Sequence, residues 1–403
     1  MDQLPPFGRA ISQIILPTFK AYAPLLRQNS ETIKSTRRET FPYGPHPRQH
    51  LDVYTPSRSS FSSRSPSPSL SSPSSPPNAD KKTPLPVTHN PNSVFIFLYG
   101  GGFVNGAKIL PDYPEPGSGQ GLVYANLGHF FAENLGVKTV VIDYRLISHG
   151  AKFPSGGRDL ELAIEWVVDN LNSNLNSGHG GDDDEHAPPP PPPPLDLYIM
   201  GNSAGGVHLA TYLLAPDFAE SRRRLLSSSI RAADDSSAET RSKAHQARLK
   251  GVIFLSVPFH FDRALPERKS TLATYYGDDH DDDVRSKAPL GLLRASRKSD
   301  DGSIKPLQQD VSVLVLKGSL DPEDEILGPI ADFADEWLRQ KKKGTDDDDR
   351  SLSRSLSPSN LEVEMMPGQH NHISPVLSLG TGIPDEEAWG RRVVEFVATT
   401  SRS

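Results

Sequence analysis

The pentapeptide Gly201-Asn202-Ser203-Ala204-Gly205 matches the pattern G-x-S-x-G, in which the serine can act as a nucleophile. It follows the apolar run Leu197–Met200, which predicts a buried strand, and apolar residues recur at helical spacing after it. An elbow of strand, tight turn and helix exposes the serine, and its glycines let the strand and the helix approach without a Cβ clash. This context strengthens the match, and partners elsewhere in the chain must decide between a nucleophilic Ser203 and a serine that only forms a turn.

Partners for a nucleophilic serine follow two later strands. Asp321 comes after the predicted strand VSVLVLKG and a turn at Gly318, and both His370 and His372 come after the predicted strand LEVEMM. The order serine, aspartate, histidine is that of the elbow enzymes. In that chemistry the imidazole takes the proton of Ser203 as the oxygen attacks an acyl carbon, and the aspartate fixes the imidazole tautomer and stabilises the imidazolium.

Two of these assignments stay open on the residues alone. His370 and His372 are two residues apart, so we expect only one of them to reach the serine. Glu323 and Asp324 lie close to Asp321 in the sequence and compete with it for the role of the acid. The sequence therefore predicts a triad in which the base and the acid each have alternatives.

A glycine-rich segment could supply the remaining part of such a site. The segment YGGGF, Tyr99–Phe103, follows the predicted strand SVFIFL. The amides of Gly101 and Gly102, together with that of Ala204, could donate hydrogen bonds to the oxyanion that forms on an attacked carbonyl. Removing one such donor costs about 3 kcal/mol of transition-state stabilisation, so this loop matters almost as much as the triad.

Composition and charge exclude several other classes. The 403 residues include no cysteine, which rules out disulfides, thiolate catalysis and cysteine-bound zinc and favours a cytoplasmic location. A net charge of -7 with scattered basic residues does not indicate a nucleic-acid partner. We expect no signal peptide, because the first residues have no basic segment followed by a continuous apolar core, and no membrane span, because no run of about 18 apolar residues occurs. We also expect no cofactor and no metal, since the acidic runs GDDHDDD and DDDEH lack EF-hand spacing.

Predicted strands and helices alternate along the chain. An amphipathic N-terminal helix around Ile11 to Phe19 precedes a hairpin of strands Glu39–Tyr43 and His50–Tyr54. Later strands alternate with the helical segments LGHFFAENLG, DLELAIEWVVDNL and EILGPIADFADEWLRQ, and a last helix runs from Pro384 to Thr399. This order predicts an α/β fold, with a mostly parallel sheet covered by helices on both faces and a ligand site at the carboxyl ends of the strands.

The low-complexity segments interrupt one domain rather than separate several. We expect a single domain over residues 1–403, with insertions at about 56–86, 173–194 and 341–359. Many of the 38 prolines fall in these blocks, and such Ser/Pro-rich or charged sequence cannot build a packed core. Residues 262–306 are interpreted as a small, cap-like helical region.

Two further polar residues are expected to have structural roles. His208, in the helix that follows Ser203, is interpreted as a histidine packed against the sheet. Arg145, in the segment DYRL, is expected to pair with a carboxylate and hold a loop.

Five motifs in order, YGGGF, DYRL, GNSAGG, SLDPEDE and HNHIS, resemble the hormone-sensitive-lipase and carboxylesterase branch of the α/β hydrolases, particularly the fungal-esterase and kynurenine-formamidase-like group. The likeness extends from about Glu39 to Thr399, except in the insertions. Tyr99 stands where family members usually have histidine, and Phe103 stands where the formamidases have tryptophan.

This resemblance implies an α/β-hydrolase fold and a serine esterase that works through an acyl-enzyme. In the family pattern the acid is the first aspartate of the motif, which corresponds to Asp321, and the base corresponds to His372. The implied partner is a small-molecule ester. Two alternatives remain, an arylformamidase that hydrolyses N-formylkynurenine and a non-catalytic binding protein with the same fold.

Overall fold

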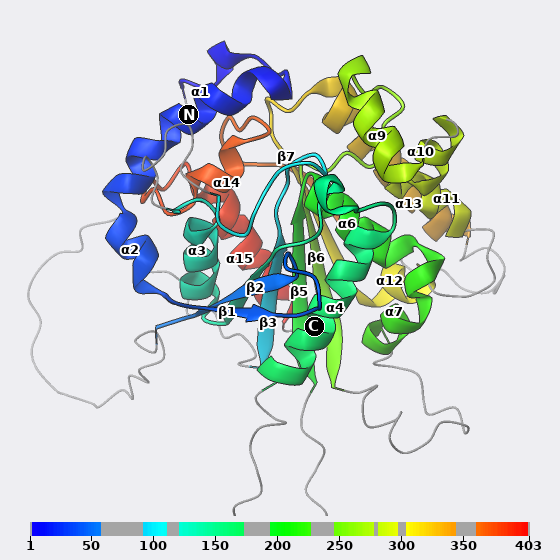
Figure 1. The fold of residues 1–403 in the computed structure, drawn as a ribbon, viewed down its shortest axis with the longest axis horizontal. Helices are drawn as coiled ribbons and strands as arrows, with labels where there is room; N and C mark the ends of the chain where they lie inside the picture. The colour runs from blue at the N-terminus through cyan, green and yellow to red at the C-terminus, as the bar shows by residue number, and fades with distance from the viewer. Residues whose placement is uncertain are drawn as a thin grey trace, which may run out of the picture.

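The computed structural model describes residues 2–57, 92–110, 121–172, 194–226, 246–277, 281–296, 304–343 and 360–401. These residues form one eight-stranded sheet with the spatial order β1-β2-β4-β3-β5-β6-β7-β8 (Figure 1). Its strands are β1 (Arg37–Pro42), β2 (His50–Thr55), β3 (Ser93–Leu98), β4 (Lys138–Ile142), β5 (Leu195–Asn202), β6 (Ala247–Leu255), β7 (Ser312–Lys317) and β8 (Leu361–Met365).

The strand pairing has the arrangement of the α/β-hydrolase fold. The first two strands pair antiparallel as the expected hairpin, β2 also runs antiparallel to β4, and every other neighbouring pair is parallel. The strand order reverses around β3, which lies between β4 and β5. The expected α/β-hydrolase fold, with a mostly parallel sheet, is confirmed.

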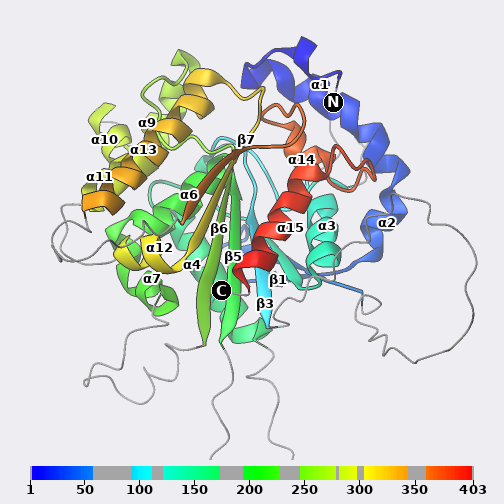
Figure 2. The same cartoon turned by 180° about the vertical axis from the view of Figure 1, so that it is seen from behind.

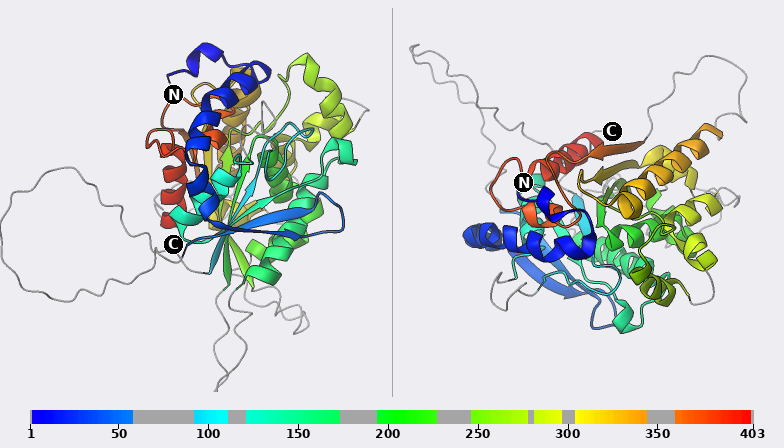
Figure 3. Two further views of the ribbon diagram at one scale, coloured as in Figure 1. Left: turned by 60° about the vertical axis from the view of Figure 1, so that its left-hand side comes forward. Right: turned by 90° about the horizontal axis from the view of Figure 1, so that it is seen from above.

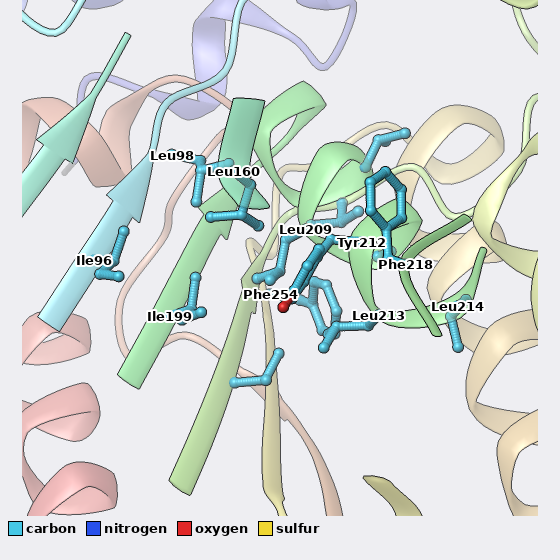
Figure 4. Close-up of a cluster of buried hydrophobic side chains, with 14 of the residues drawn as sticks. Ile96, Leu98, Leu160, Ile199, Leu209, Tyr212, Leu213, Leu214, Phe218 and Phe254 are labelled. Atoms are coloured by element: carbon cyan, nitrogen blue, oxygen red, sulfur yellow. The ribbon is translucent and has the colours of Figure 1, made fainter. Parts of the chain in front are cut away.

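Alternating side chains of the central strands supply two separate cores. Along β3, Ile96 and Leu98 belong to one buried cluster while Phe95 and Phe97 belong to the other. A strand buried on both faces needs an apolar side chain at every position, which explains the continuous apolar run of its sequence. Figure 4 shows the first cluster, in which Leu98 lies close to Leu160 of the helix that follows β4.

Helices cover both faces of the sheet, as expected (Figures 1 and 2). The views from the side and from above separate the two layers (Figure 3). One face carries α1 (Ile11–Gln28), α2 (Ser30–Ser35), α3 (Ala125–Leu135), α14 (Ser374–Ser378) and α15 (Ala388–Thr400). The other carries α4 (Ser155–Leu171), α6 (Ala204–Leu214), α7 (Ala219–Leu226), α11 (Pro289–Ser296), α12 (Ile304–Asp310) and α13 (Gly328–Lys343). Short 3-10 helices are η1 (Pro5–Phe7), η3 (Ile147–His149) and η4 (Pro216–Phe218).

The region expected to be helical between residues 262 and 306 contains several short helices. These are η5 (Pro266–Arg268), α9 (Lys269–Tyr276), α10 (Asp281–Lys287) and α11, with α12 beginning at its end. The aromatic ring of Tyr275 in α9 stacks on Phe103, with ring centroids 4.4 Å apart. This contact joins the region to the glycine-rich loop after β3.

Several element boundaries differ from the sequence predictions. The helix expected from Asp159 begins four residues earlier, at Ser155, because Gly156 lies against His208, where an added Cβ would come within 2.0 Å of the imidazole. Tertiary packing there overrides the low helix propensity of glycine. The strand expected to reach Phe259 ends at Leu255.

The C-terminal part also differs in detail. The last helix begins at Ala388 rather than Pro384, because the Glu387 carboxylate accepts hydrogen bonds from the amides of Gly380 and Gly382 and holds the preceding residues in turns. The short helix α14 was not predicted. The helix α13 follows a π-helical turn, η6 (Glu323–Leu327), and continues to Lys343, inside the expected third insertion. Most of the three expected insertions lies outside the described residues.

Candidate active site

Ser203 occupies a strained turn between β5 and α6. Its backbone angles are φ 49° and ψ -120°, a conformation that costs a residue with a Cβ about 1–3 kcal/mol. The neighbouring glycine, Gly205, is required by close packing, because an added Cβ would lie 2.4 Å from the carbonyl oxygens of Leu98 and Tyr99. The strand, turn and helix expected around this serine are therefore present.

The structure brings three of the expected residues together in one hydrogen-bonded chain. The Oγ of Ser203 lies 2.9 Å from Nε2 of His372, and Nδ1 of His372 lies 3.1 Å from Oδ1 of Asp321. The three side chains come from segments that follow β5, β7 and β8, all at the carboxyl ends of parallel strands. The side chains expected to act as nucleophile, base and orienting acid thus lie within hydrogen-bond reach of their neighbours in this order, which is the geometry that a serine nucleophile needs.

The carboxylate of Asp321 is fully buried and has donors on both oxygens. Oδ2 accepts hydrogen bonds from Ser256 Oγ and from the amide of Gly318, both at 2.7 Å. Ser256, the residue directly after β6, has a left-handed backbone with φ 48°. These contacts hold one carboxylate oxygen toward His372.

His370 lies away from the serine. Its Nδ1 is 3.0 Å from the hydroxyl of Ser374, while its buried Nε2 has no partner within the described part of the chain. Burial lowers the pKa of His370 to about 4, against an opposing effect of nearby Asp321. Of the two histidines that the residues left open, the structure places His372 against Ser203.

The other acidic residues after β7 point elsewhere. Glu323 and Asp324 are exposed, and Asp324 faces Arg263 at 3.7 Å. Glu325, which sequence reasoning did not consider, is buried and pairs with Arg268 at 3.1 Å. Asp321 alone among these carboxylates contacts a histidine within the described residues.

The glycine-rich loop lies directly against the elbow. A Cβ added at Gly100 would lie 3.0 Å from Cβ of Ser203. The amides of Gly101, Gly102 and Ala204 donate no hydrogen bond to any of the described residues. At Gly101 an added Cβ would lie 1.9 Å from the carbonyl oxygen of Asn105, so the tight turn itself requires glycine there.

Buried tyrosines hold the start of this loop. The Tyr144 hydroxyl donates a hydrogen bond to the carbonyl oxygen of Tyr99 at 2.7 Å. The Tyr99 hydroxyl donates to Asp143 at 2.7 Å and accepts a hydrogen bond from Arg48 at 2.6 Å. Burial raises the pKa values of Tyr99 and Asp143, so the tyrosine keeps its proton as a donor. Where the resembling family usually has histidine, Tyr99 therefore anchors the loop through its hydroxyl.

The two residues expected to be structural have such roles. Arg145 binds Asp159 through Nη2 at 2.8 Å, which confirms the expected pairing with a carboxylate. His208 is buried as expected, but it lies among the rings of Phe103, Tyr144 and Tyr275 rather than on the sheet alone. Burial lowers the pKa of His208 to about 4.

Sequence reasoning missed the contribution of the N-terminal segment. The guanidinium of Arg9 donates a hydrogen bond to the carbonyl oxygen of Asp321 at 2.7 Å. In α1, the Thr18 hydroxyl accepts a hydrogen bond from Nδ2 of Asn371 at 2.9 Å. The helix lies beside α14, as Figure 1 shows at the carboxyl edge of the sheet. No local motif carries a signal for contacts between residues more than 300 positions apart.

Within the described ranges, no group of three or more histidine, aspartate and glutamate side chains is arranged to hold a metal ion. None of the helices formed by these residues has the length and apolar character needed to cross a membrane.

Comparison with known proteins found distant similarities, and no family model matches the chain. The acetylcholinesterase of Electrophorus electricus is 28% identical over 144 residues, which are 33% of this chain and 18% of that enzyme. The chain therefore spans less than a fifth of the length of this relative.

Two of the similar solved structures are esterases. Esterase B from Lactobacillus rhamnosis, bound to an inhibitor, is 12% identical with a TM-score of 0.48, covering 96% of both chains. An esterase from the Planctomycetes species Thermogutta terrifontis is 16% identical with a TM-score of 0.46, covering 91% of this chain and 93% of that one. At such identities and scores the assignment of the fold rests on the sheet topology.

Proposed function

We propose that this protein is a serine hydrolase that cleaves carboxylic esters through an acyl-enzyme. The observation that carries the proposal is the chain of contacts from Ser203 through His372 to Asp321, with spacings of 2.9 and 3.1 Å. In this proposal Ser203 is the nucleophile, His372 the general base and acid, and Asp321 the residue that orients the base. A relative named acetylcholinesterase, although it aligns over only part of its length, supports the same class of reaction.

The first half of the reaction transfers the acyl group to the enzyme. Because Nδ1–H of His372 donates to the carboxylate of Asp321, Nε2 carries the lone pair that takes the proton of Ser203. The serine oxygen forms a bond to the ester carbonyl carbon, and the amides of Gly101, Gly102 and Ala204 bind the resulting oxyanion. The bond to the alcohol oxygen then breaks, and that oxygen takes the proton from Nε2 and leaves as the alcohol.

The second half uses the same groups with water in place of the serine hydroxyl. Water gives a proton to Nε2 of His372 and attacks the acyl carbon. When the tetrahedral intermediate collapses, the bond to Oγ of Ser203 breaks and the serine regains its proton from the imidazole. The carboxylic acid leaves, and the free enzyme is restored without a cofactor.

We also propose that the protein belongs to the hormone-sensitive-lipase and carboxylesterase branch, because its sequence contains the five motifs described above. The helices between residues 262 and 306 are proposed to form the cap, and the insertions to be additions to one domain. Of the two alternative functions, an arylformamidase would use the same triad and oxyanion amides, whereas a non-catalytic binding protein would need none of them. The small-molecule partner is proposed to be an ester, and the cytoplasmic location stays a prediction.

A direct test compares esters with formamides on one preparation. We expect the wild-type protein to hydrolyse short p-nitrophenyl esters faster than N-formylkynurenine and to be labelled at Ser203 by a fluorophosphonate. Ser203→Ala should lose at least about 10⁴-fold in kcat, because the oxyanion donors alone retain only a small part of the catalysis. Labelling at another serine, or an active Ser203→Ala protein, would contradict the assignment, and faster turnover of the formamide would replace the ester as substrate.

A further inference from the structure

A cationic side chain lies beside the proposed oxyanion loop. Arg268 ends the 3-10 helix η5, and its Nη2 would lie 4.0 Å from a Cβ added at Gly102. Among the described residues, no other heavy atom lies within 4 Å of that position apart from Gly102 and its two chain neighbours. The guanidinium therefore faces the glycine whose amide is proposed to bind the carbonyl oxygen of the substrate.

Most donors of this guanidinium are unused within the described part of the chain. Nη1 donates to Glu325 at 3.1 Å, and the planar group lies 5.9 Å from the ring of Phe261. A guanidinium has five N–H donors, and the side chain of Arg268 makes no other hydrogen bond to the described residues. Because its side chain is only 23% exposed, these donors are partly withdrawn from water and favour an acceptor supplied by a ligand.

A second donor without a partner lies in the same cluster. The Tyr276 hydroxyl is buried and makes no hydrogen bond to the described residues. Its ring lies 5.9 Å from that of Phe261 and 6.1 Å from that of Phe103, the residue directly after Gly102. Both Arg268 and Tyr276 thus lie close to Phe261. Tyr276 also lies close to Phe103 in the glycine-rich loop, and Arg268 lies close to Gly102 in the same loop.

The charge of Arg268 is already balanced. The buried carboxylate of Glu325 is 6% exposed and offsets the guanidinium charge at hydrogen-bond distance. The catalytic Asp321 adds a further buried negative charge nearby in the sequence, and Arg263 turns outward to Asp324. The side chains around Arg268 therefore present hydrogen-bond donors without a net positive charge, which suits an uncharged oxygen better than a carboxylate.

We propose that Arg268 is a specificity-determining residue that binds an uncharged acceptor oxygen, such as an ether, hydroxyl or second carbonyl, in the acyl group of the ester. This inference rests on the proposed esterase function. The leaving alcohol must face Nε2 of His372 to receive its proton, whereas Arg268 lies beside Gly102. The acceptor oxygen is therefore assigned to the acyl side of the substrate.

The test uses two p-nitrophenyl esters of nearly equal shape, the pentanoate and the 3-methoxypropanoate, in which an ether oxygen replaces one methylene. The ratio of their kcat/KM values cancels effects that both esters share. We expect Arg268→Met to lower the ratio of methoxypropanoate to pentanoate about tenfold, the factor given by one hydrogen bond of ~1.4 kcal/mol. Arg263→Met, an exposed arginine on the same segment, is the matched control and should leave the ratio as in wild type.

A substitution of Glu325 tests the argument that the charge of Arg268 is balanced. The mono-p-nitrophenyl ester of glutarate carries a carboxylate and should be the poorest of the three esters for the wild-type protein. Glu325→Gln removes the balancing charge but keeps a hydrogen-bond acceptor for Arg268. We therefore expect its kcat/KM for the glutarate ester to rise at least fivefold relative to the pentanoate.

Two outcomes would overturn the inference. An active Arg268→Met protein could keep the wild-type ratio of the two neutral esters, including the case in which both rates fall by the same factor, or wild type could prefer the glutarate ester. If Arg268→Met is unstable, the glutarate result with Glu325→Gln decides the question. Failure of the esterase proposal is distinct, because wild type would then hydrolyse none of the esters and Ser203 would not be labelled.

Discussion

The hydroxyl of Ser256 donates a 2.7 Å hydrogen bond to Oδ2 of Asp321, the carboxylate whose other oxygen faces His372. Ser256 adopts a left-handed backbone to reach this position, and its side chain is fully buried. A strained backbone is retained only where the surrounding structure holds it in place, and here it lies at a contact with this carboxylate. We therefore predict that Ser256 is a positioning residue, which acts on the proposed reaction through Asp321.

Replacing Ser256 by alanine should slow catalysis about tenfold with a small change in KM. The carboxylate loses one of its donors and becomes a stronger base, so the apparent pKa of the general base in the kcat/KM profile should move upward. Steady-state kinetics from pH 5 to 9 would measure both effects. Ser319→Ala is the control, because the buried Ser319 hydroxyl has no partner among the described residues. Equal behaviour of the two variants would contradict the role of Ser256.

The two neighbouring histidines should differ sharply in their effect on activity. We expect His372→Ala to lose about as much activity as Ser203→Ala, since members of a triad act as a unit. His370→Ala should keep most of its kcat and lose stability instead, because its buried side chain contacts Ser374 and not the serine nucleophile. Rates on one activated ester, with unfolding midpoints in urea, separate the effects. A dead His370 variant beside an active His372 variant would reverse the assignment.

Loss of the Tyr144 hydroxyl should weaken the proposed oxyanion loop. Tyr144→Phe removes the donor to the Tyr99 carbonyl, the residue before the first loop glycine. We expect kcat to fall about tenfold with little change in KM, since misplaced amides affect the transition state more than the bound ester. Tyr124→Phe is the matched control, because its ring also stacks on Tyr99 but its hydroxyl makes no hydrogen bond to the described residues. A similar loss in both variants would indicate general loosening of the core.

The free energy of unfolding should decrease as the pH is lowered, because two histidines are buried in the folded protein. Burial lowers the pKa values of His208 and His370 to about 4, below the value of about 6.5 in the unfolded chain. As pH drops from 6.5 toward 4, the unfolded chain takes up these protons first, so each histidine reduces the unfolding free energy by up to ~1.4 kcal/mol per pH unit.

Substituting one of the two isolates its share of this effect. His208→Phe keeps a ring within the aromatic cluster but cannot titrate, so the stability of the variant should depend less on pH between 6.5 and 4 than that of wild type. Urea unfolding at four pH values in this range provides the measurement. Parallel curves for the two proteins would refute the assigned protonation of His208.

The residues that follow strands in recognisable motifs could be predicted from the sequence, whereas their supports could not. Ser203 and Asp321 each come directly after a buried strand, and parallel strands bring such positions to one edge of the sheet. The choice of His372 over His370 required the resemblance. The path of that loop depends on Asn371, whose side chain accepts hydrogen bonds from the amides of Ile373 and Ser374.

The supporting residues lack such signals because they act through distant contacts. Ser256, Arg9 and Thr18 are single common residues with no motif around them, and only the folded chain brings them to the loops that carry Asp321 and His372. The early start of α4 is a similar case, because Gly156 packs closely on His208, 52 positions later in the sequence. Helix propensity depends on the residues of the local segment, so it carries no information about a contact with a residue elsewhere in the sequence.

The contact between Thr18 and Asn371 also limits how early the helix α1 can reach its final environment during synthesis of the chain. The two residues are 353 positions apart, and ribosomes add about 5–20 residues per second, so the helix containing Thr18 waits roughly 20 to 70 s for this partner. During that interval its apolar side chains, among them Ile14 and Tyr22, lack their final neighbours. A nascent chain that already contains Ser203 and Asp321 still lacks His372, the proposed base, and its helix α1 exposes an apolar surface on which a chaperone could act during synthesis.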